Sequence, residues 1–320
     1  MNKKFLSFLL IVPFSLAPCA KVQNSYANGI PTFSKNANMH NKPDFVEYIQ
    51  ITEPPEPNKG KTERVPIPKE VTPKQNCNET TNINNVNYNT EEKNWFYKPK
   101  KDGTPSEEPP EALELLKKYS GYYLGDTSKK VIYLTFDEGY EKGYTSKILD
   151  TLKANDVKAA FFVTTDYING NKDLIRRMVA EGHLVCNHSD SHPSMAQAAL
   201  RGKEKFEQEF TLTERAFEKV TGAKMPKFFR PPMGKYSELS MNYTQELGYK
   251  TIFWSFAYKD WIPEQQPSHE YAKKIIMERT HNGGIFLLHA VSKTNADIMD
   301  SILKEWKSKG FEFKTLNELP

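Results

Sequence analysis

Cysteine is scarce in this chain of 320 residues, which contains only Cys19, Cys77 and Cys186. Cys77 lies in a polar segment and Cys186 in an apolar one, so a disulfide between them would tie a loose segment to a core strand. We therefore expect no disulfide framework. An exported protein of this kind must rely on its hydrophobic core, and a domain of about 200 residues is large enough to provide one.

An excess of charge of one sign is also missing. The chain carries 44 Lys and Arg against 40 Asp and Glu, a net charge of +4. The basic residues form no clustered stripe, which argues against a nucleic-acid partner. The small surplus would suit an anionic surface such as a cell wall, and it is equally typical of an ordinary solvated surface.

Long hydrophobic runs are absent except at the N-terminus. Lys3 and Lys4 precede an apolar run over residues 5–17, and small residues follow it. Positive residues, an apolar stretch and small residues are the three parts of a secretory signal peptide, with cleavage expected after Ala20 or Ala27.

We therefore predict that residues 1–27 form a signal peptide and that the protein is exported. Pro13 interrupts the apolar run, which is short for a bilayer span. An uncleaved membrane anchor is the alternative. Lipid attachment at Cys19 is disfavoured because Pro18 stands where a small residue is expected.

Residues 28–92 have the composition of a linker. Prolines cluster over residues 43–73, and an Asn-rich stretch, TNINNVNYNT, covers residues 81–90. Such a segment buries too little apolar surface to offset the entropy of ordering it. We predict a flexible spacer here.

Order is expected to resume at three adjacent aromatic residues, Trp95, Phe96 and Tyr97. Aromatic side chains in a polar stretch need a surface on which to pack. A helix is predicted over residues 111–119, directly after a Pro-Pro pair. We interpret residues 93–129 as an arm packed on the main domain, residues 130–320.

From residue 131 strands and helices alternate. Short continuous apolar runs, typical of parallel strands covered on both faces, lie at residues 131–136, 159–164, 183–187, 227–230, 250–255, 284–289 and 311–316. Helical patterns lie at residues 144–155, 172–181, 203–221, 237–247, 270–280 and 295–309. Helices are predicted to end at left-handed glycines, Gly182, Gly222, Gly248 and Gly310. This alternation predicts an α/β fold, either a (β/α) barrel or an open parallel sheet.

Reactive side chains follow several of these strands: Asp137 and Glu138, His188, Arg230, His289, and Asp260 with Trp261. The carboxyl ends of parallel strands meet at one edge, which is where active sites form in such folds. One polar residue there could arise by chance. Several converging strand ends predict one active site.

His188 and His192 are spaced i, i+4, which places both rings on one face if the segment turns helically. Two such imidazoles are a usual way to hold zinc. An isolated pair would more often be structural, but this pair follows one strand while the acids Asp137 and Glu138 follow another. Adjacent acids diverge on an extended chain, so one can face a metal and the other a water to be deprotonated. The alternative is two solvated acids.

His289 could be a core histidine or a general acid that Asp260 holds and charges. Arg230 precedes the rigid Pro231–Pro232 pair and could clamp a carboxylate in one orientation. The alternative is a structural ion pair, which is the same contact without a catalytic role.

In these residues the chain resembles the polysaccharide deacetylases (carbohydrate esterase family four, with the NodB-homology domain). Five motifs occur in the family's order within residues 130–318: TFDEGY, NHSDSH, RPPMG, the region of Asp260 and Trp261, and LLH. The resemblance implies a distorted (β/α) barrel of about seven strands.

Carried over by position, the resemblance implies a general base at Asp137 oriented by Arg230, and a general acid at His289 tuned by Asp260. The implied metal ligands are Glu138, His188 and His192, around one divalent ion, zinc, with cobalt, manganese or another ion as alternatives. The implied contacts to the oxyanion and substrate come from the residues Tyr140, Pro231 and Trp261. One position departs from the family: Glu138 stands where an aspartate is usual, and its longer side chain must fold back to reach the same ion.

FDEGYEKGYT, NWFY and LLHAVSKTNADIMDSIL resemble the spore-cortex branch of the family, which forms muramic δ-lactam. That branch implies a peptidoglycan glycan strand as substrate, N-acetylmuramic acid as the sugar, and an amidase that first removes the stem peptide. We expect a monomer with no nucleic-acid partner. Two alternatives remain: a deacetylase of N-acetylglucosamine in peptidoglycan or chitin-like chains, and a non-catalytic wall-binding module that has lost its metal through Glu138.

Overall fold

A computed structural model describes residues 49–50 and 87–320. The predicted signal peptide and most of the predicted linker lie outside these residues. Within them, no helix combines the length and the apolar character that crossing a membrane requires.

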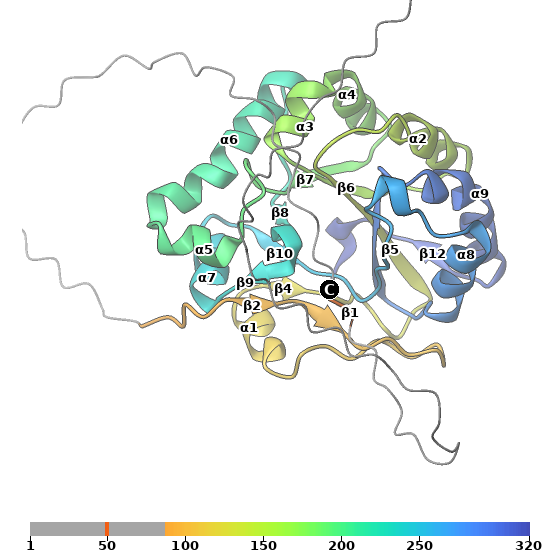
Figure 1. The fold of residues 1–320 in the computed structure, drawn as a ribbon, viewed down its shortest axis with the longest axis horizontal. Helices are drawn as coiled ribbons and strands as arrows, with labels where there is room; N and C mark the ends of the chain where they lie inside the picture. The colour runs from red at the N-terminus through yellow and green to blue at the C-terminus, as the bar shows by residue number, and fades with distance from the viewer. Residues whose placement is uncertain (1–48, 51–86) are drawn as a thin grey trace, which may run out of the picture. The chain divides into compact units, whose positions relative to one another are not determined.

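A curled parallel sheet forms the centre of the fold (Figure 1). Its strands run in the order β11-β5-β6-β7-β8-β10-β4, and β12 pairs in parallel with the start of β5. Their bounds are β4 (Gly121–Tyr122), β5 (Val131–Glu138), β6 (Ala160–Val163), β7 (Leu184–Asn187), β8 (Phe228–Phe229), β10 (Lys250–Ile252), β11 (Gly284–His289) and β12 (Glu312–Phe313). All seven predicted strands are present. The strand β4 was not predicted, because two residues, one of them a glycine, leave no apolar run to recognise.

The segment after β10 turns back onto β11 and curls the sheet into a distorted half-barrel. The Ser255 amide donates to the Ile285 carbonyl at 3.0 Å, and the Leu287 amide donates to the Phe256 carbonyl at 2.8 Å. The predicted barrel-like α/β fold is thereby confirmed, and the alternative of a fully open sheet is wrong.

Helices cover the outside of the sheet (Figure 1). Their bounds are α1 (Ala112–Lys118), α2 (Thr145–Ala154), α3 (Thr165–Gly170), α4 (Lys172–Ala180), α5 (Met195–Leu200), α6 (Lys203–Thr221), α7 (Glu238–Glu246), α8 (His269–Glu278) and α9 (Lys293–Ser308). Every predicted helix is found, and the six-residue helices α3 and α5 were not predicted because they are too short to show a period. The four glycines expected after helices all have positive φ, between 73° and 81°.

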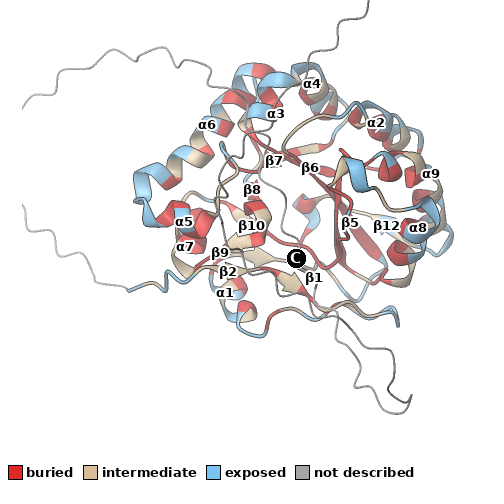
Figure 2. Cartoon of the chain, viewed as in Figure 1, coloured by how far each residue is buried: buried red, intermediate tan, exposed pale blue. Residues whose placement is uncertain are grey.

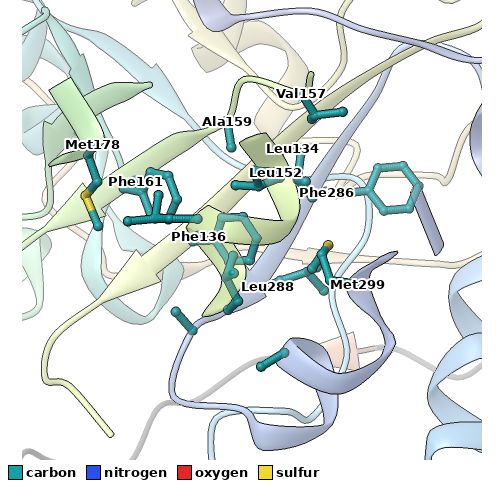
Figure 3. Packing of buried hydrophobic residues seen from close by; sticks show 14 of the residues in the cluster. Leu134, Phe136, Leu152, Val157, Ala159, Phe161, Met178, Phe286, Leu288 and Met299 are labelled. Atoms are coloured by element: carbon teal, nitrogen blue, oxygen red, sulfur yellow. The ribbon is translucent and has the colours of Figure 1, made fainter. Parts of the chain in front are cut away.

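The strand β5 separates two hydrophobic clusters by the alternation of its side chains. Leu134 and Phe136 face the helices, where they join Phe161, Leu288 and Met299 (Figure 3). The other face of β5 contributes to a cluster inside the curl of the sheet. Buried residues accordingly fill the strands and the inner faces of the helices (Figure 2). Alternation therefore sends Asp137 toward the inside of the curl and Glu138 toward the helices.

The segment before the main domain is built into it. Residues Phe96–Tyr97 form β3, which pairs with β1 (Ile49–Gln50), and Lys93–Asn94 form β2, which pairs with β9 (Lys235–Tyr236). Trp95 is fully buried, stacks on Phe253 with ring centroids 4.4 Å apart, and donates from Nε1 to the Trp254 carbonyl at 2.9 Å.

Ordered contacts begin before residue 93. Glu92 accepts hydrogen bonds from Ser194 at 2.6 Å and from Gln197 at 3.2 Å, and it forms an ion pair with Lys235 at 2.8 Å. Part of the segment predicted as linker therefore ties the start of α5 to β9.

We predict that His183 makes the fold sensitive to acid. Its ring is buried, its Nδ1 accepts from the Ala159 amide at 3.1 Å, and burial lowers its pKa from 6.5 to about 4. The folded state thus favours the neutral ring, whereas the unfolded chain protonates near pH 6.5. The resulting stability is complete above that value and is lost as the pH falls toward about 4, so about 2 kcal/mol should disappear between pH 7 and pH 5.

Urea unfolding at both pH values measures this loss. His183→Gln, whose side-chain oxygen can still accept from the amide, should flatten the dependence. The exposed His269→Gln should retain it, and an equally steep loss in His183→Gln would contradict the assignment.

Candidate active site

A buried ion pair lies at the centre of the site. Asp137, at the end of β5, accepts from Arg230 Nη1 at 2.7 Å through Oδ1. Asp137 is 4% exposed and Arg230 is fully buried. A charge in such surroundings is tolerated only with a close partner of opposite sign.

The guanidinium of Arg230 is fixed on its other sides as well. Its Nε donates to the Ile252 carbonyl at 3.1 Å and its Nη2 to the Phe253 carbonyl at 3.3 Å. The Phe162 ring lies 4.2 Å from the guanidinium carbon, a cation–π distance. Arg230 therefore joins β5, β6 and the end of β10, and it holds the Asp137 carboxylate in one orientation.

The predicted histidine pair follows β7. His188 Nδ1 lies 2.8 Å from the Arg230 carbonyl, which makes Nδ1 the protonated nitrogen, and His188 Nε2 lies 3.7 Å from Asp137 Oδ2. The rings of His188 and His192 have centroids 5.0 Å apart. Arg230 thus orients both Asp137, through its side chain, and His188, through its backbone.

The helical turn assumed for this pair is wrong. The segment is a loop in which Ser189 and His192 have positive φ values of 71° and 55°. The Ser189 amide donates to Asn187 Oδ1 at 2.8 Å and the His192 amide donates to Ser189 Oγ at 3.0 Å. These side chain–backbone bonds bring the rings together in place of a helix.

Glu138 has a different environment from its neighbour. It is fully buried, and neither carboxyl oxygen has a hydrogen-bond partner among the described residues. Burial raises its pKa well above the usual range, and Glu141 adds to the rise. Residues 49–50 and 87–320 contain no cluster of three His, Cys, Asp or Glu side chains already converged as metal ligands.

His289 and Asp260 form a second pair at the same edge of the sheet. His289 Nδ1 lies 2.7 Å from Asp260 Oδ1, and the His289 amide donates to Asp260 Oδ2 at 2.9 Å. In the β11–β5 pairing His289 is the direct partner of Asp137. Asp137 and His289, which the sequence suggested as general base and general acid, are therefore neighbours on the paired strands β5 and β11.

The remaining predicted residues lie around these pairs. The Trp261 ring centroid is 5.8 Å from that of His289, and Trp261 is 8% exposed. Pro231 is buried and its carbonyl accepts from the Gly234 amide at 3.0 Å, closing the turn after β8. Tyr140 is half-buried, with Lys142 Nζ 5.6 Å from its ring centroid. No described contact ties Tyr140 to the two pairs, so its expected role stays a prediction.

Sequence reasoning missed Asn295, which contacts the second pair, and Tyr258, which contacts Asn295. Asn295 Nδ2 donates to Asp260 Oδ2 at 2.6 Å, and Tyr258 donates to Asn295 Oδ1. The sequence offered one signal: Asn295 is a polar residue in the first turn of a helix with an apolar face. Such a residue rarely indicates a site.

A carboxylate held by arginine, a histidine held by aspartate and a nearby pair of imidazoles suit hydrolysis of an amide or ester. The family model described as polysaccharide deacetylase matches residues 124–252. The chain is 38% identical over 226 residues to the peptidoglycan-N-acetylmuramic acid deacetylase PdaA of Bacillus subtilis, covering 71% of this chain and 85% of PdaA. The chain belongs to the polysaccharide deacetylase family. It is therefore a hydrolase.

Solved structures agree with this assignment. That of Bacillus subtilis PdaA, a family 4 carbohydrate esterase, matches with a TM-score of 0.69 at 38% identity, covering 72% of this chain and 97% of that one. A family 4 carbohydrate esterase from Bacillus anthracis matches with a TM-score of 0.60 at 43% identity over the same shares. A peptidoglycan-N-acetylglucosamine deacetylase of Bacillus cereus is 29% identical over 205 residues, 63% of this chain and 72% of its own length.

We predict that Arg230→Leu lowers the free energy of unfolding of this deacetylase by about 3–5 kcal/mol, because Asp137 keeps its buried charge without a partner. Thermal or urea unfolding at neutral pH measures the change. Lys304→Leu is the matched control: its ion pair with Asp300, at 2.7 Å, is exposed to solvent, and its loss should change the stability far less. Equal costs for the two variants would contradict the importance assigned to the buried pair.

Proposed function

We propose that this deacetylase hydrolyses the N-acetyl group of N-acetylmuramic acid in peptidoglycan, as a step toward muramic δ-lactam in the spore cortex. The similarity to PdaA across most of that protein's length carries the proposal. The lower identity to the N-acetylglucosamine deacetylase favours muramic acid over glucosamine.

In the proposed reaction, Asp137 accepts a proton from the attacking water. Arg230 Nη1 donates a hydrogen bond to Asp137 Oδ1 at 2.7 Å, so Oδ2 is the oxygen that would take the proton. His289 gives a proton to the departing amine from Nε2, because Nδ1 is engaged by Asp260 at 2.7 Å. The products are acetate and a free amine, which can close onto the lactyl carboxyl group with loss of water.

The remaining residues would position the substrate. The Trp261 indole beside His289 would offer an apolar face to a sugar ring. The Tyr140 amide would donate to the oxyanion. Pro231, in the turn that follows Arg230, would line the edge of the same site.

We propose His188, His192 and Glu138 as the residues that would hold a divalent metal. One observation supports the histidine ligands: the Arg230 carbonyl fixes the tautomer of His188, as in metal-ligating histidines. Glu138 is a buried carboxyl group without a hydrogen-bond partner among the described residues, and it would have to turn from the helix face of β5 toward His188 to complete the set. A bound divalent ion would supply Lewis-acid polarisation of the acetyl carbonyl. Zinc suits the imidazoles, with cobalt and manganese as alternatives.

The cellular setting follows from the substrate. A peptidoglycan substrate implies action outside the cytoplasm, consistent with the signal peptide expected from the sequence. The lactam requires a lactyl group without a stem peptide, so an amidase would act first. A monomer without a nucleic-acid partner suffices for this reaction.

Substrate choice is tested by acetate release. We expect faster release from peptide-free muramyl glycan than from chitooligosaccharide. Asp137→Asn should lower the rate by roughly 100- to 10,000-fold, because the base is lost. Faster release from chitooligosaccharide would support the glucosamine alternative, and no release from either substrate would support a non-catalytic wall-binding module.

Metal binding is tested by calorimetric titration of the chelator-treated protein with Zn²⁺. We expect His192→Ala and Glu138→Gln to weaken affinity by at least about tenfold, since even outer-shell partners of a metal contribute roughly 10- to 100-fold. His269→Ala, an exposed histidine, should bind as the wild type does. Unchanged affinity in Glu138→Gln would remove Glu138 from the ligand set and leave the histidines in place.

A further inference from the structure

We infer that Asn295 is a positioning residue that holds the Asp260–His289 pair in its working geometry. The inference rests on the proposed function in one respect, the role of His289 as general acid. Asn295 is fully buried in the first turn of α9, three residues after the helix-capping Ser292.

The amide of Asn295 touches both members of the pair. Its Nδ2 donates to Asp260 Oδ2 at 2.6 Å and to the His289 carbonyl at 3.2 Å. Asp260 Oδ2 also accepts from the His289 amide at 2.9 Å, while Oδ1 faces His289 Nδ1. Both oxygens of the carboxylate are thereby fixed, and one of the fixing donors is Asn295.

The orientation of this amide is set by its other end. Tyr258 donates its hydroxyl proton to Asn295 Oδ1, so Nδ2 must face Asp260. An amide turned the other way would place its oxygen against a carboxylate. Tyr258 therefore selects the one orientation that supports Asp260.

A second chain of hydrogen bonds ties the same two segments together. Ser292 Oγ accepts from the backbone amide of Asn295 at 3.0 Å and donates to Gln266 Oε1. Gln266 Nε2 donates to the Asp260 carbonyl at 2.8 Å. The start of α9 and the loop that carries Asp260 thus form one hydrogen-bonded unit, in which Asn295 alone reaches the carboxylate.

Few titratable groups surround Asn295. Tyr258 and Asp260 lie on the loop after β10, and His289 ends β11. Glu138 on β5 acts electrostatically on His289, and Tyr271 on α8 acts on Tyr258. A new carboxyl group at position 295 would face Asp260 directly.

Asn295→Asp makes the donor dependent on pH while keeping its shape. As a neutral acid, its O–H can donate to Asp260 Oδ2 in place of the amide. Once ionised, it sets a second negative charge against Asp260. We expect the ratio of its kcat to that of the wild type to fall on the order of tenfold between about pH 6 and pH 9.

Asn295→Leu removes the donor at every pH. Its kcat for acetate release from peptide-free muramyl glycan should fall about 10- to 100-fold, the worth of a hydrogen bond to a charged group, with little change in KM. Tyr258→Phe removes only the group that orients the amide, and it should show a smaller loss in the same direction. Thermal unfolding identifies any variant that is not folded.

Asn155→Leu is the matched control. Asn155 also donates its amide to an aspartate, Asp300, at 3.0 Å, but at the end of α2. It should keep the wild-type kcat and pH profile. A kcat of Asn295→Leu within twofold of the wild type, or an Asn295→Asp profile parallel to that of the wild type, would overturn the inference.

Proton NMR separates this inference from the proposed function. The downfield Nδ1–H signal of His289, assigned with His289→Gln, should shift or broaden in Asn295→Leu without substrate present. If the wild type releases no acetate but this signal responds, the proposed function fails and the positioning role stands. If acetate is released and the signal is unchanged in Asn295→Leu, the positioning role fails.

Discussion

The buried pair of Asp137 and Arg230 is the constraint on which the site depends. Arg230 reaches Asp137 on β5, the ring of Phe162 on β6, and two carbonyls at the end of β10. Its own carbonyl orients His188 after β7. A guanidinium has donors in a fixed planar arrangement, so satisfying all of them at once fixes the separation of these strand ends. The arm supports this arrangement from outside, because Trp95 stacks on Phe253, whose carbonyl is one of the acceptors.

Base and acid are held by different means. The carboxylate of Asp137 is matched by the full positive charge of Arg230, with Oδ1 2.7 Å from Nη1. The carboxylate of Asp260 receives backbone and amide donors and the ring of His289, with no lysine or arginine paired to it among the described residues. Its charge is thus directed at the imidazole of His289, whose Nδ1 lies 2.7 Å from Asp260 Oδ1. Two aspartates at one sheet edge are therefore held by different partners, an arrangement that fits the opposite proton transfers proposed for Asp137 and His289.

Much of this could be predicted from the sequence, for definite reasons. Short apolar runs ending in Asp137, His188 and His289 mark parallel strands and place their polar ends at one edge. The loop after β7 could not be predicted, because positive φ at His192 follows from a hydrogen bond to Ser189 that leaves no periodic pattern. Asn295 could not be predicted for a similar reason: its partner Asp260 lies 35 residues earlier, and the contact depends on how the start of α9 packs against the loop that carries Asp260.

The contrast between Asp137 and Glu138 follows from the geometry of a strand. Successive side chains point to opposite faces, so adjacent acids enter different surroundings. One meets Arg230, and the other enters an apolar layer where no hydrogen bond receives it among the described residues. Burial without a partner disfavours the charged form of Glu138, which is why its pKa is raised well above the usual range. The same alternation places the Glu138 carboxyl group on the face of β5 opposite Asp137, so the acidic ligand proposed for the metal has to cross from the helix layer to reach His188.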